Sequence, residues 1–345
     1  MPHADLSLHR LSESEHPEWD AFVLDCPDAT FFHRAAWQGL MENVFGHRTH
    51  FLYARRAGRI VAVLPLAEVH SRLFGHALTS LPFCVYGGIA GDPAAAPLLE
   101  AEAERIALAR GVQHLEYRNL SPRHTDWPRQ DLYVTFRKAI DPDVEANLTA
   151  IPRKQRAMVR KGIKNALVSH IDPDVERFFA LYADNVRRHG TPALPKRFFA
   201  TLMDVFGEQC QVMTVTGPDG QLLSSVLSFY FRDEVLPYYA GDAVAARALA
   251  ANDFKYWALM QHACERGVRL FDYGRSKIGT GPYSFKKNWG FEPQPLSYEY
   301  RLYKRDAIPQ NNPMNPKYRA FIAMWKRLPL PVANALGPYI VRNLG

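Results

Sequence analysis

The pattern of apolar and polar residues runs through the same series of elements twice. In each half, two helical segments precede two short apolar strands separated by a turn, and a loop, a helix and a further strand follow. In the second half the turn is Pro218-Asp219-Gly220, a sequence that favours tight turns. Strands that alternate with helices in this way predict an α/β (α+β) fold. The predicted helices are 16–26, 34–44 and 93–109 in the first half and 174–188, 196–206 and 251–266 in the second, and the predicted hairpins are 49–69 and 211–231.

Two short segments carry the clearest trace of an internal repeat. Residues 107–118 read ALARGVQHLEYR, and residues 263–274 read ACERGVRLFDYG. In both, a helix is predicted to end at a glycine, Gly111 or Gly267, where the left-handed backbone conformation costs little. A short strand follows at once. Chance similarity over a dozen residues is the alternative, but the shared order of elements favours duplication.

The repeat divides the chain into two α/β domains and a tail. We expect a boundary near Asp141-Pro142, a first domain over 1–140, and a second domain over 141–305 that contains the active cleft. The tail over 306–345 is rich in proline and asparagine at first and then becomes apolar and basic. It is predicted to form helices that pack on the body of the protein, and contact with an anionic membrane face is the alternative.

Composition indicates a globular protein that favours anionic partners. Of the 345 residues, 47% are hydrophobic and 22% are charged, and the formal net charge is +7. A positive excess favours phosphates, nucleic acid or an anionic membrane, whereas a generally basic soluble protein is the plainer alternative. The four cysteines are far apart and no metal-ligand spacing occurs, so we expect no metal, no cofactor and no disulfide framework. The N-terminus has no apolar signal region and no apolar run approaches the ~20 residues of a membrane span, which predicts a cytoplasmic protein.

The segment 152–164, PRKQRAMVRKGIK, contains six basic residues and no acid. It begins with a proline, which suits the first turn of a helix. We expect Val159, Ile163 and Leu167 to form an apolar stripe that packs on the protein. The basic face then suits phosphates, a tRNA acceptor end or a nucleotide-linked sugar, and a solvated surface is the alternative. The basic residues are Arg153, Lys154, Arg156, Arg160, Lys161 and Lys164.

A second segment, FDYGRSKIGTGPYSFKKNWGFEP over 271–293, combines glycines, cations and aromatic residues. Glycines allow the backbone to approach a ligand closely, and cations beside them favour an oxyanion or a phosphate. The segment is therefore predicted to be a shaped loop that forms the active cleft, and a structural loop that closes the sheet is the alternative. Known nucleophile, metal and phosphate-loop motifs do not occur elsewhere. The pyrophosphate signature of coenzyme A enzymes is also missing from the YYAGD region, 238–242, and the helix start after it.

These residues resemble the FemAB family, the peptidoglycan bridge-forming aminoacyltransferases. The resemblance is carried by 152–165, by 271–293 and by YYAGD with the following Asn252-Asp253-Phe254, and it is closer to the subgroup linked to exopolysaccharide and PEP-CTERM protein-sorting loci. It implies two tandem GNAT-like domains that share one cleft, with Lys286 in that cleft. It also implies transfer of an amino acid from aminoacyl-tRNA to an amine on a lipid- or nucleotide-linked envelope precursor. The long helical hairpin that Gram-positive members carry is missing, so the activated donor stays open.

We therefore expect an acyl- or aminoacyltransferase that acts on a phosphate-bearing or lipid-linked envelope or exopolysaccharide precursor. It would lie in the cytoplasm, with peripheral contact to the inner membrane as a further option. The alternatives are a coenzyme A-dependent N-acyltransferase on an amino sugar and a non-catalytic binding component of a polysaccharide or protein-sorting assembly. Catalytic roles are expected for Lys286, which would stabilise the oxyanion, and for Arg275 and Tyr283. Binding roles are expected for Arg153, Lys154, Arg156, Arg160, Lys161, Tyr86, Tyr239, Asp242, Asn252, Tyr273, Gly274, Ser276, Lys277, Gly279, Thr280, Gly281, Lys287 and Trp289.

Overall fold

The structure is a computed structural model that describes residues 6–71, 74–309 and 316–344. The chain forms two compact units, and residues near the C-terminus return to the first of them. The first unit comprises Met1–Leu132, Pro295–Gln310 and Arg342–Gly345, and the second comprises Tyr133–Gln294 and Asn311–Val341. Each unit has its own sheet and its own apolar core.

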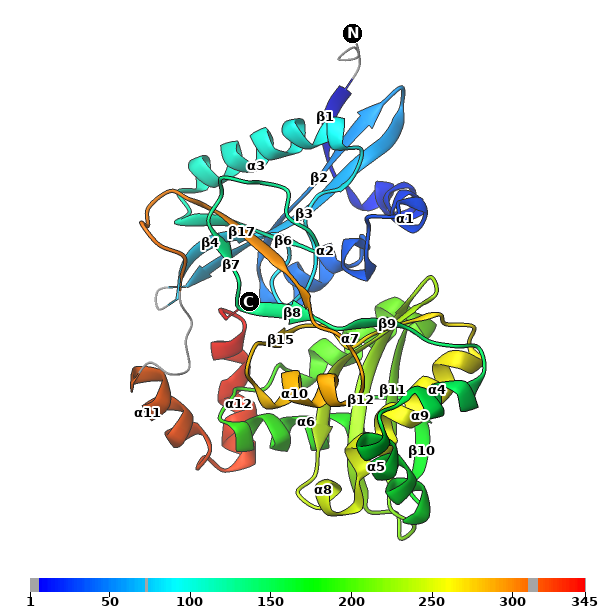
Figure 1. Cartoon of the computed structure of the whole chain (residues 1–345). Helices are drawn as coiled ribbons and strands as arrows, with labels where there is room; N and C mark the ends of the chain where they lie inside the picture. Colours follow the sequence, from blue (N-terminus) through cyan, green and yellow to red (C-terminus); the bar gives the residue numbers. More distant parts are fainter. Residues whose placement is uncertain (1–5, 72–73, 310–315, 345) are drawn as a thin grey trace. The chain divides into compact units, whose positions relative to one another are not determined.

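The first unit is built on an eight-stranded sheet with helix α3 packed along it (Figure 1). Leu99, Ala103 and Ile106 of α3 lie in one apolar cluster with residues of β2, β3 and β6. Neighbouring strands are antiparallel except for β4 and β6. The sheet order is β1 (Leu6–Arg10), β2 (Arg48–Arg56), β3 (Arg59–Ser71), β4 (Gly75–Thr79), β6 (His114–Asn119), β17 (Ser297–Leu302) and β7 (Arg129–Gln130), with β5 (Ala90–Gly91) beside β3, and the helices are α1 (His16–Asp25), α2 (Trp37–Leu40) and α3 (Ala96–Arg110).

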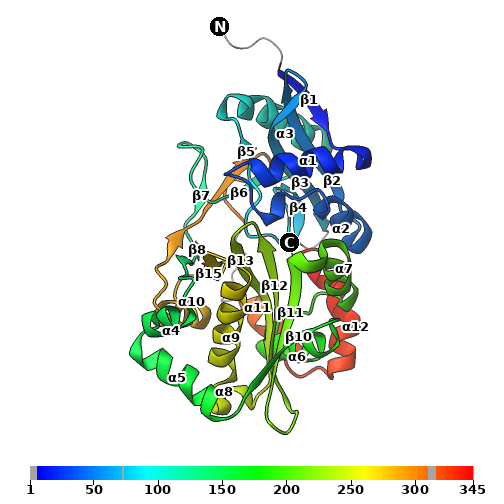
Figure 2. The same cartoon turned by 90° about the vertical axis from the view of Figure 1, so that its right-hand side faces the viewer.

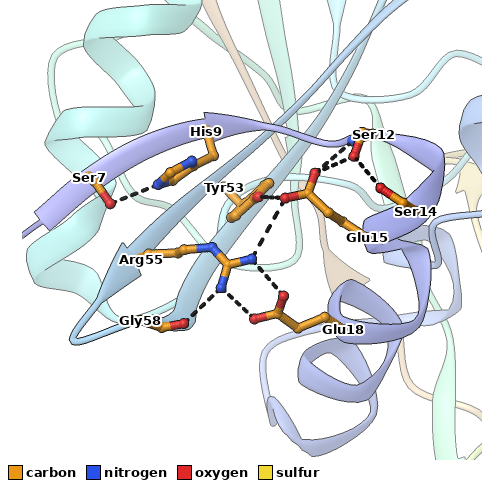
Figure 3. A network of polar contacts seen from close by, with 9 residues as sticks. All are labelled: Ser7, His9, Ser12, Ser14, Glu15, Glu18, Tyr53, Arg55 and Gly58. Atoms are coloured by element: carbon orange, nitrogen blue, oxygen red, sulfur yellow. Dashed lines mark hydrogen bonds and ion pairs between the residues drawn. The ribbon is translucent and has the colours of Figure 1, made fainter.

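A polar network ties the start of α1 to strand β2 (Figure 3). Glu15 accepts hydrogen bonds from the hydroxyls of Ser12 and Tyr53, and Arg55 binds both carboxylate oxygens of Glu18 at 2.6 Å. The Ser12 and Tyr53 hydrogen bonds lower the pKa of Glu15 to about 2. Glu15 is therefore ionised at neutral pH, and the network keeps α1 attached to β2.

The second unit is a six-stranded sheet with helices on both faces (Figure 2). Val226 of β12 packs in the cluster that contains Met260 of α9, whereas the next residue, Leu227, pairs with Tyr239, whose ring contacts Tyr182 of α6. Because neighbouring residues of a strand point to opposite faces, α9 and α6 cover opposite faces. The sheet order is β10 (Val168–Asp172), β11 (Cys210–Thr216), β12 (Leu222–Phe231), β13 (Glu234–Asp242), β14 (Leu270–Asp272) and β9 (Arg137–Ala139). The helices are α4 (Val144–Ala150), α5 (Arg153–Lys164), α6 (Glu176–His189), α7 (Lys196–Phe206), α8 (Ala246–Leu249), α9 (Ala251–Glu265), α10 (Gly281–Asn288), α11 (Pro316–Trp325) and α12 (Leu330–Val341).

The predicted helices, hairpins and final strands are present in both units, but each unit has a further strand between its hairpin and its helix, β4 in the first and β13 in the second. Helix α3 is followed by Gly111 with φ of 64°, and helix α9 by Gly267 with φ of 77° a residue after its cap, so both helices end through a left-handed glycine as the repeat predicted. Strands β6 and β14 follow directly. The predicted α/β (α+β) fold is therefore correct.

Two local predictions were wrong. The segment 271–293 is not a loop throughout, because Gly281–Asn288 form helix α10 after a turn at Thr280. The basic segment is helical as expected, and Val159 and Leu167 of the predicted stripe are buried, but Ile163 is 49% exposed and Gly162 is buried in its place. Positions 159 and 162 are three residues apart, a spacing that also puts two residues on one face of a helix.

Candidate functional site

The sheet of the second unit opens between β13 and β14. These parallel strands pair only at Glu234 with Leu270 and at Val235 with Phe271, and β13 continues to Asp242 without pairing to β14. A β-bulge at Tyr238 interrupts the pairing of β13 with β12 on the other side. Bulges of this kind turn a strand locally and are common beside functional sites. The segment that follows β14 therefore begins where the sheet divides.

Lys286 of α10 is held at the end of β14. Its side chain is 8% exposed, and its Nζ donates to the carbonyl oxygens of Tyr273 at 2.6 Å, Gly274 at 2.9 Å and Arg275 at 3.2 Å. An ammonium group has three N–H donors, so all three are engaged. Burial lowers the pKa of Lys286 to about 7, although the nearby Asp272 acts in the opposite direction. The amine can therefore gain or lose a proton near neutral pH.

The turn after β14 depends on Gly274 and Asp272. Gly274 has φ of 65°, a conformation that few residues other than glycine adopt readily. The fully buried carboxylate of Asp272 accepts hydrogen bonds from the backbone N–H of Gly274 at 2.7 Å and from the Thr135 hydroxyl at 3.0 Å. These contacts and those of Lys286 fix the backbone of three consecutive residues, whose carbonyl groups point at one amine.

Two acidic residues beside this turn, Asp272 and Glu234, were not predicted from the sequence. Both lie close to the guanidinium of Arg137, Asp272 at 3.3 Å and Glu234 at 2.6 Å. Burial, and then the charge of Asp272, raises the pKa of Glu234 to about 7. The available signal was an aspartate within the apolar run of the predicted strand, since a buried acid is rare unless it is paired.

Two hydroxyl groups of the segment that begins at β14 have no hydrogen-bond partner within the described part of the chain. They belong to Tyr273 and Ser276, and both residues are buried. The Tyr273 ring packs against Tyr256 and Trp289, so it belongs to the aromatic core of the unit. Tyr283 is half-buried and packs edge-on against the Phe136 ring, 5.5 Å between centroids.

Two buried hydrogen bonds to Asp253 connect the basic helix to the segment after β14. Asp253 of α9 accepts hydrogen bonds from the Gln155 amide of α5 at 2.5 Å and from the Trp289 indole at 3.0 Å. Burial raises the pKa of Asp253. Trp289 is only 1% exposed, so in this structure the ring packs in the core rather than facing solvent.

The basic helix α5 presents an unneutralised positive surface. Five of its cations are exposed, and Arg156, which is half-buried, donates to the carbonyl oxygen of Thr149 at 2.8 Å. No ion pair involves any of the six between Arg153 and Lys164, as far as the described residues extend. The helix is anchored by its uncharged face, so its cations remain available for phosphates.

The other predicted site residues are distributed over several places. Arg275 is exposed, with its guanidinium 4.6 Å from the centre of the Tyr133 ring. Asp242 accepts hydrogen bonds from the fully buried Lys255 at 3.0 Å and from Ser224, so its charge already has partners. Tyr239 lies in an aromatic cluster with Phe199. The turn before α10 contains Lys277, Gly279, Thr280 and Gly281, Lys287 lies over the Tyr283 ring, Asn252 is half-buried in the first turn of α9, and Tyr86 is buried in the first unit.

The structure thus groups the backbone carbonyls of Tyr273, Gly274 and Arg275 around Lys286, while Tyr239 and Asp242 belong to other clusters. Among the residues described, no group of histidine, cysteine, aspartate and glutamate side chains is arranged to hold a metal ion. None of the helices in those residues combines the length and the apolar character that a membrane crossing requires.

Replacing Gly162 by alanine is expected to destabilise the second unit by about 1–3 kcal/mol. A Cβ atom at this position would lie 2.7 Å from the Cβ of Phe254 in α9, so α5 would have to move away. The matched control is Gly39→Ala in α2, where the new Cβ meets only the Asn43 amide at 3.6 Å. Thermal unfolding should show a lower Tm for the first variant and an equal or higher Tm for the second. An unchanged Tm for Gly162→Ala would contradict the close contact between α5 and α9.

Comparisons with known proteins agree with this geometry. A family model described as an acetyltransferase (GNAT) domain matches residues 153–287, which include α5, the divided strands and Lys286. Among solved structures, FemX is similar at a TM-score of 0.68 and 15% identity, over 86% of this chain and 98% of that chain. Two others are the C-terminal domain of a putative lysylphosphatidylglycerol synthetase from Agrobacterium fabrum, with TM-score 0.55, 14% identity and coverage of 91% and 95%, and a tandem GNAT protein from the clavulanic acid biosynthesis pathway, with TM-score 0.52, 14% identity and coverage of 88% and 100%. By sequence, no curated protein matches. The fold is therefore FemAB-like, with tandem GNAT-like units.

Proposed function

We propose that this FemAB-like GNAT acyltransferase transfers an acyl or aminoacyl group to an amine or hydroxyl of a phosphate-bearing envelope or exopolysaccharide precursor. The observation that carries the substrate class is helix α5, a surface of six cations without ion-pair partners in the described chain. Buried contacts through Gln155 and Trp289 connect that helix to the segment that holds Lys286. In this proposal α5 binds the phosphate group of the substrate, and the reacting part of the same substrate extends toward Lys286.

In the proposed reaction, the acceptor nitrogen or oxygen attacks the carbonyl carbon of an activated ester. A tetrahedral intermediate with a negatively charged oxygen forms, and the bond from the carbonyl carbon to the leaving group then breaks. The acceptor loses one proton and the leaving group gains one. Lys286 supplies the positive charge that stabilises the oxyanion, a contribution of about 3–4 kcal/mol in comparable sites.

The contacts of Lys286 indicate how it would reach an oxyanion. All three of its N–H groups are engaged, so one carbonyl has to be exchanged for the substrate oxygen. The hydrogen bond to the Arg275 carbonyl is the longest, at 3.2 Å, so we expect this bond to be the one that is exchanged for the substrate oxygen. The exposed Arg275 side chain then lies beside the exchanged position and suits a phosphate of donor or acceptor.

The tail supports an acceptor at a membrane surface. Residues 307–345 contain no aspartate or glutamate. Met324 of α11 and Val332 and Leu336 of α12 are exposed, and the exposed Lys326 lies between the two helices. Exposed apolar groups beside cations suit peripheral contact with an anionic membrane, where lipid-linked precursors reside.

A coenzyme A thioester is the second candidate donor, because the matched domain is described as an acetyltransferase. The loop from 243 to 250, which precedes α9, contains no glycine, so the backbone approach that a pyrophosphate needs is restricted there. We therefore expect acetyl-CoA to give no measurable heat in titration calorimetry, whereas charged tRNA binds in a salt-dependent manner. Saturable binding of acetyl-CoA with no binding of tRNA would favour the acyl-CoA reaction instead.

On the non-catalytic alternative, the Lys286 amine would be packed against an acid as a structural ion pair. Lys286 instead donates to three backbone carbonyls. This arrangement supports a reactive amine rather than a structural ion pair.

A further inference from the structure

We propose that a cavity in the first unit binds a small hydroxylated amine, such as the amino-sugar part of a larger molecule. The cavity has a volume of about 260 Å³ and lies between α3, the strands β6 and β17, and the segment from 120 to 128. It is outside the matched acetyltransferase domain, and its occupancy does not depend on the reaction proposed at Lys286. Its lining residues are Pro97, Glu100, Ala101, Glu104, Leu115, His124, Trp127, Arg301 and Tyr303.

One wall of the cavity is a fixed aromatic stack. The rings of His124 and Trp127 lie parallel, with centroids 3.9 Å apart and an interplanar angle of 11°. His124 Nδ1 is 2.7 Å from the fully buried carboxylate of Glu299, which also accepts hydrogen bonds from Asn119 and Ser297. A buried, fully hydrogen-bonded carboxylate holds the imidazole in one orientation. The stack is therefore a rigid surface against which the apolar face of a sugar ring can pack.

Two glutamates of α3 line the cavity, each beside one basic residue. Glu100 lies 3.2 Å from His124 Nε2, and Glu104 lies 3.1 Å from Arg301. In each glutamate these contacts use one carboxylate oxygen, and the described residues provide no contact to the other. The lining thus has two carboxylates beside one guanidinium and one imidazole, so one negative charge remains whenever the imidazole is uncharged. An ammonium group would neutralise it and bind the two available oxygens.

One phenol group of the lining supplies hydrogen bonds for a ligand hydroxyl. The hydroxyls of Tyr117 and Tyr303 have no partner in the described chain, and Tyr117 is fully buried. Tyr303 lines the cavity, and Tyr117 lies two positions after the lining residue Leu115 on β6, so its side chain is on the same face of the strand although it is not itself a lining residue. Burial raises the pKa of Tyr303 to about 12, and both phenols stay protonated at neutral pH. The lining residue Tyr303 can therefore donate to and accept from a ligand hydroxyl.

The corresponding place in the second unit has almost no open volume. Helix α9, strand β14 and its antiparallel neighbour β9 repeat the arrangement of α3, β6 and β17. The cavity beside them measures only about 10 Å³, and the buried side chains of Met260, Trp289 and Phe291 are among those that line it. The first unit has an open, polar and charged cavity where its duplicate has packed aromatic side chains. That difference favours a binding role for the first copy.

The test is titration calorimetry on the full chain with glucosamine and with N-acetylglucosamine, in which the amine is uncharged. We expect glucosamine to bind at least about tenfold more tightly, because a hydrogen bond between charged groups contributes about 1.5–3 kcal/mol. Equal affinities, or no saturable binding of glucosamine, would overturn the proposal.

Variants on α3 separate this cavity from the rest of the helix. Glu100→Gln should weaken glucosamine binding about tenfold. The matched control is Glu102→Gln on the same helix, whose carboxylate binds Arg10 and Arg105 outside the cavity, and it should bind glucosamine as the wild type does. Glu104→Gln provides a second cavity variant if Glu100→Gln does not fold. Unchanged glucosamine affinity in a folded Glu100→Gln or Glu104→Gln variant would overturn the assignment.

Discussion

Replacing Lys286 by methionine is expected to lower kcat by about 10²–10³-fold with a much smaller change in KM. Methionine keeps most of the side-chain volume but removes the charge and the contacts to the carbonyls of Tyr273, Gly274 and Arg275. The effect falls on kcat because the charge is needed most in the tetrahedral intermediate. Steady-state kinetics on the purified variant measure it, and full turnover by Lys286→Met would contradict the role of this amine.

A control and a pH profile separate catalysis from folding in this variant. Lys304→Met also removes a lysine that donates to a backbone carbonyl, that of Gly111 at 2.8 Å, but this lysine is exposed and lies in the first unit, so activity should be unchanged. The pKa of Lys286 is about 7 in the folded chain and about 10.5 in its ordinary state, so the unfolded chain binds more protons between these values. Stability of the wild type should therefore rise with pH over this window, by at most about 1.4 kcal/mol per pH unit. The methionine variant should lack this rise.

Removing three exposed charges from the basic helix is expected to weaken binding of phosphate-bearing substrates about 10- to 100-fold at low salt. The triple variant Arg160→Gln, Lys161→Gln, Lys164→Gln keeps the buried face of α5 and changes only exposed side chains. The slope of the logarithm of the tRNA binding constant against the logarithm of the salt concentration should also become shallower, by about one for every phosphate that the variant no longer binds. Binding of charged tRNA, measured over a series of salt concentrations, provides both quantities.

A control with the same change in charge is available in the first unit. Arg48, Arg59 and Arg129 are exposed and scattered, so their replacement by glutamine lowers the net charge equally without changing α5. This control should bind tRNA nearly as the wild type does. Equally weakened binding in the two triple variants would mean that overall charge, rather than the basic helix, governs binding.

The main elements of the fold could be predicted because they depend on local patterns. The glycine at the end of α3 and of α9, the turn at Pro218-Asp219-Gly220 and the helical spacing of α5 are all visible in short windows of sequence. Strand β17 was missed because its place beside β6 is set by pairing between residues about 180 positions apart. Helix α10 was missed because glycine, proline and threonine at its start indicate a loop when packing is ignored.

The candidate site was predictable in its centre and not in its surroundings. The segment 271–293 stood out by its glycines, cations and aromatic residues, the resemblance to the FemAB family singled out Lys286 within it, and the structure places that lysine among carbonyl groups of the same segment. Asp253 could not be identified, since its partners Gln155 and Trp289 come from segments about 100 and 36 residues away. Burial decides such roles, and burial depends on the tertiary fold.

The most direct test of the proposed transferase is mass spectrometry of nucleotide- and lipid-linked envelope precursors after incubation with the full chain and a donor. Charged tRNA and acetyl-CoA are supplied in separate reactions. We predict a precursor whose mass increases by one aminoacyl or acyl group with the wild-type chain, and no such product with Lys286→Met. A modified precursor formed equally by both proteins, or no modified precursor with either donor, would contradict acyl transfer at Lys286.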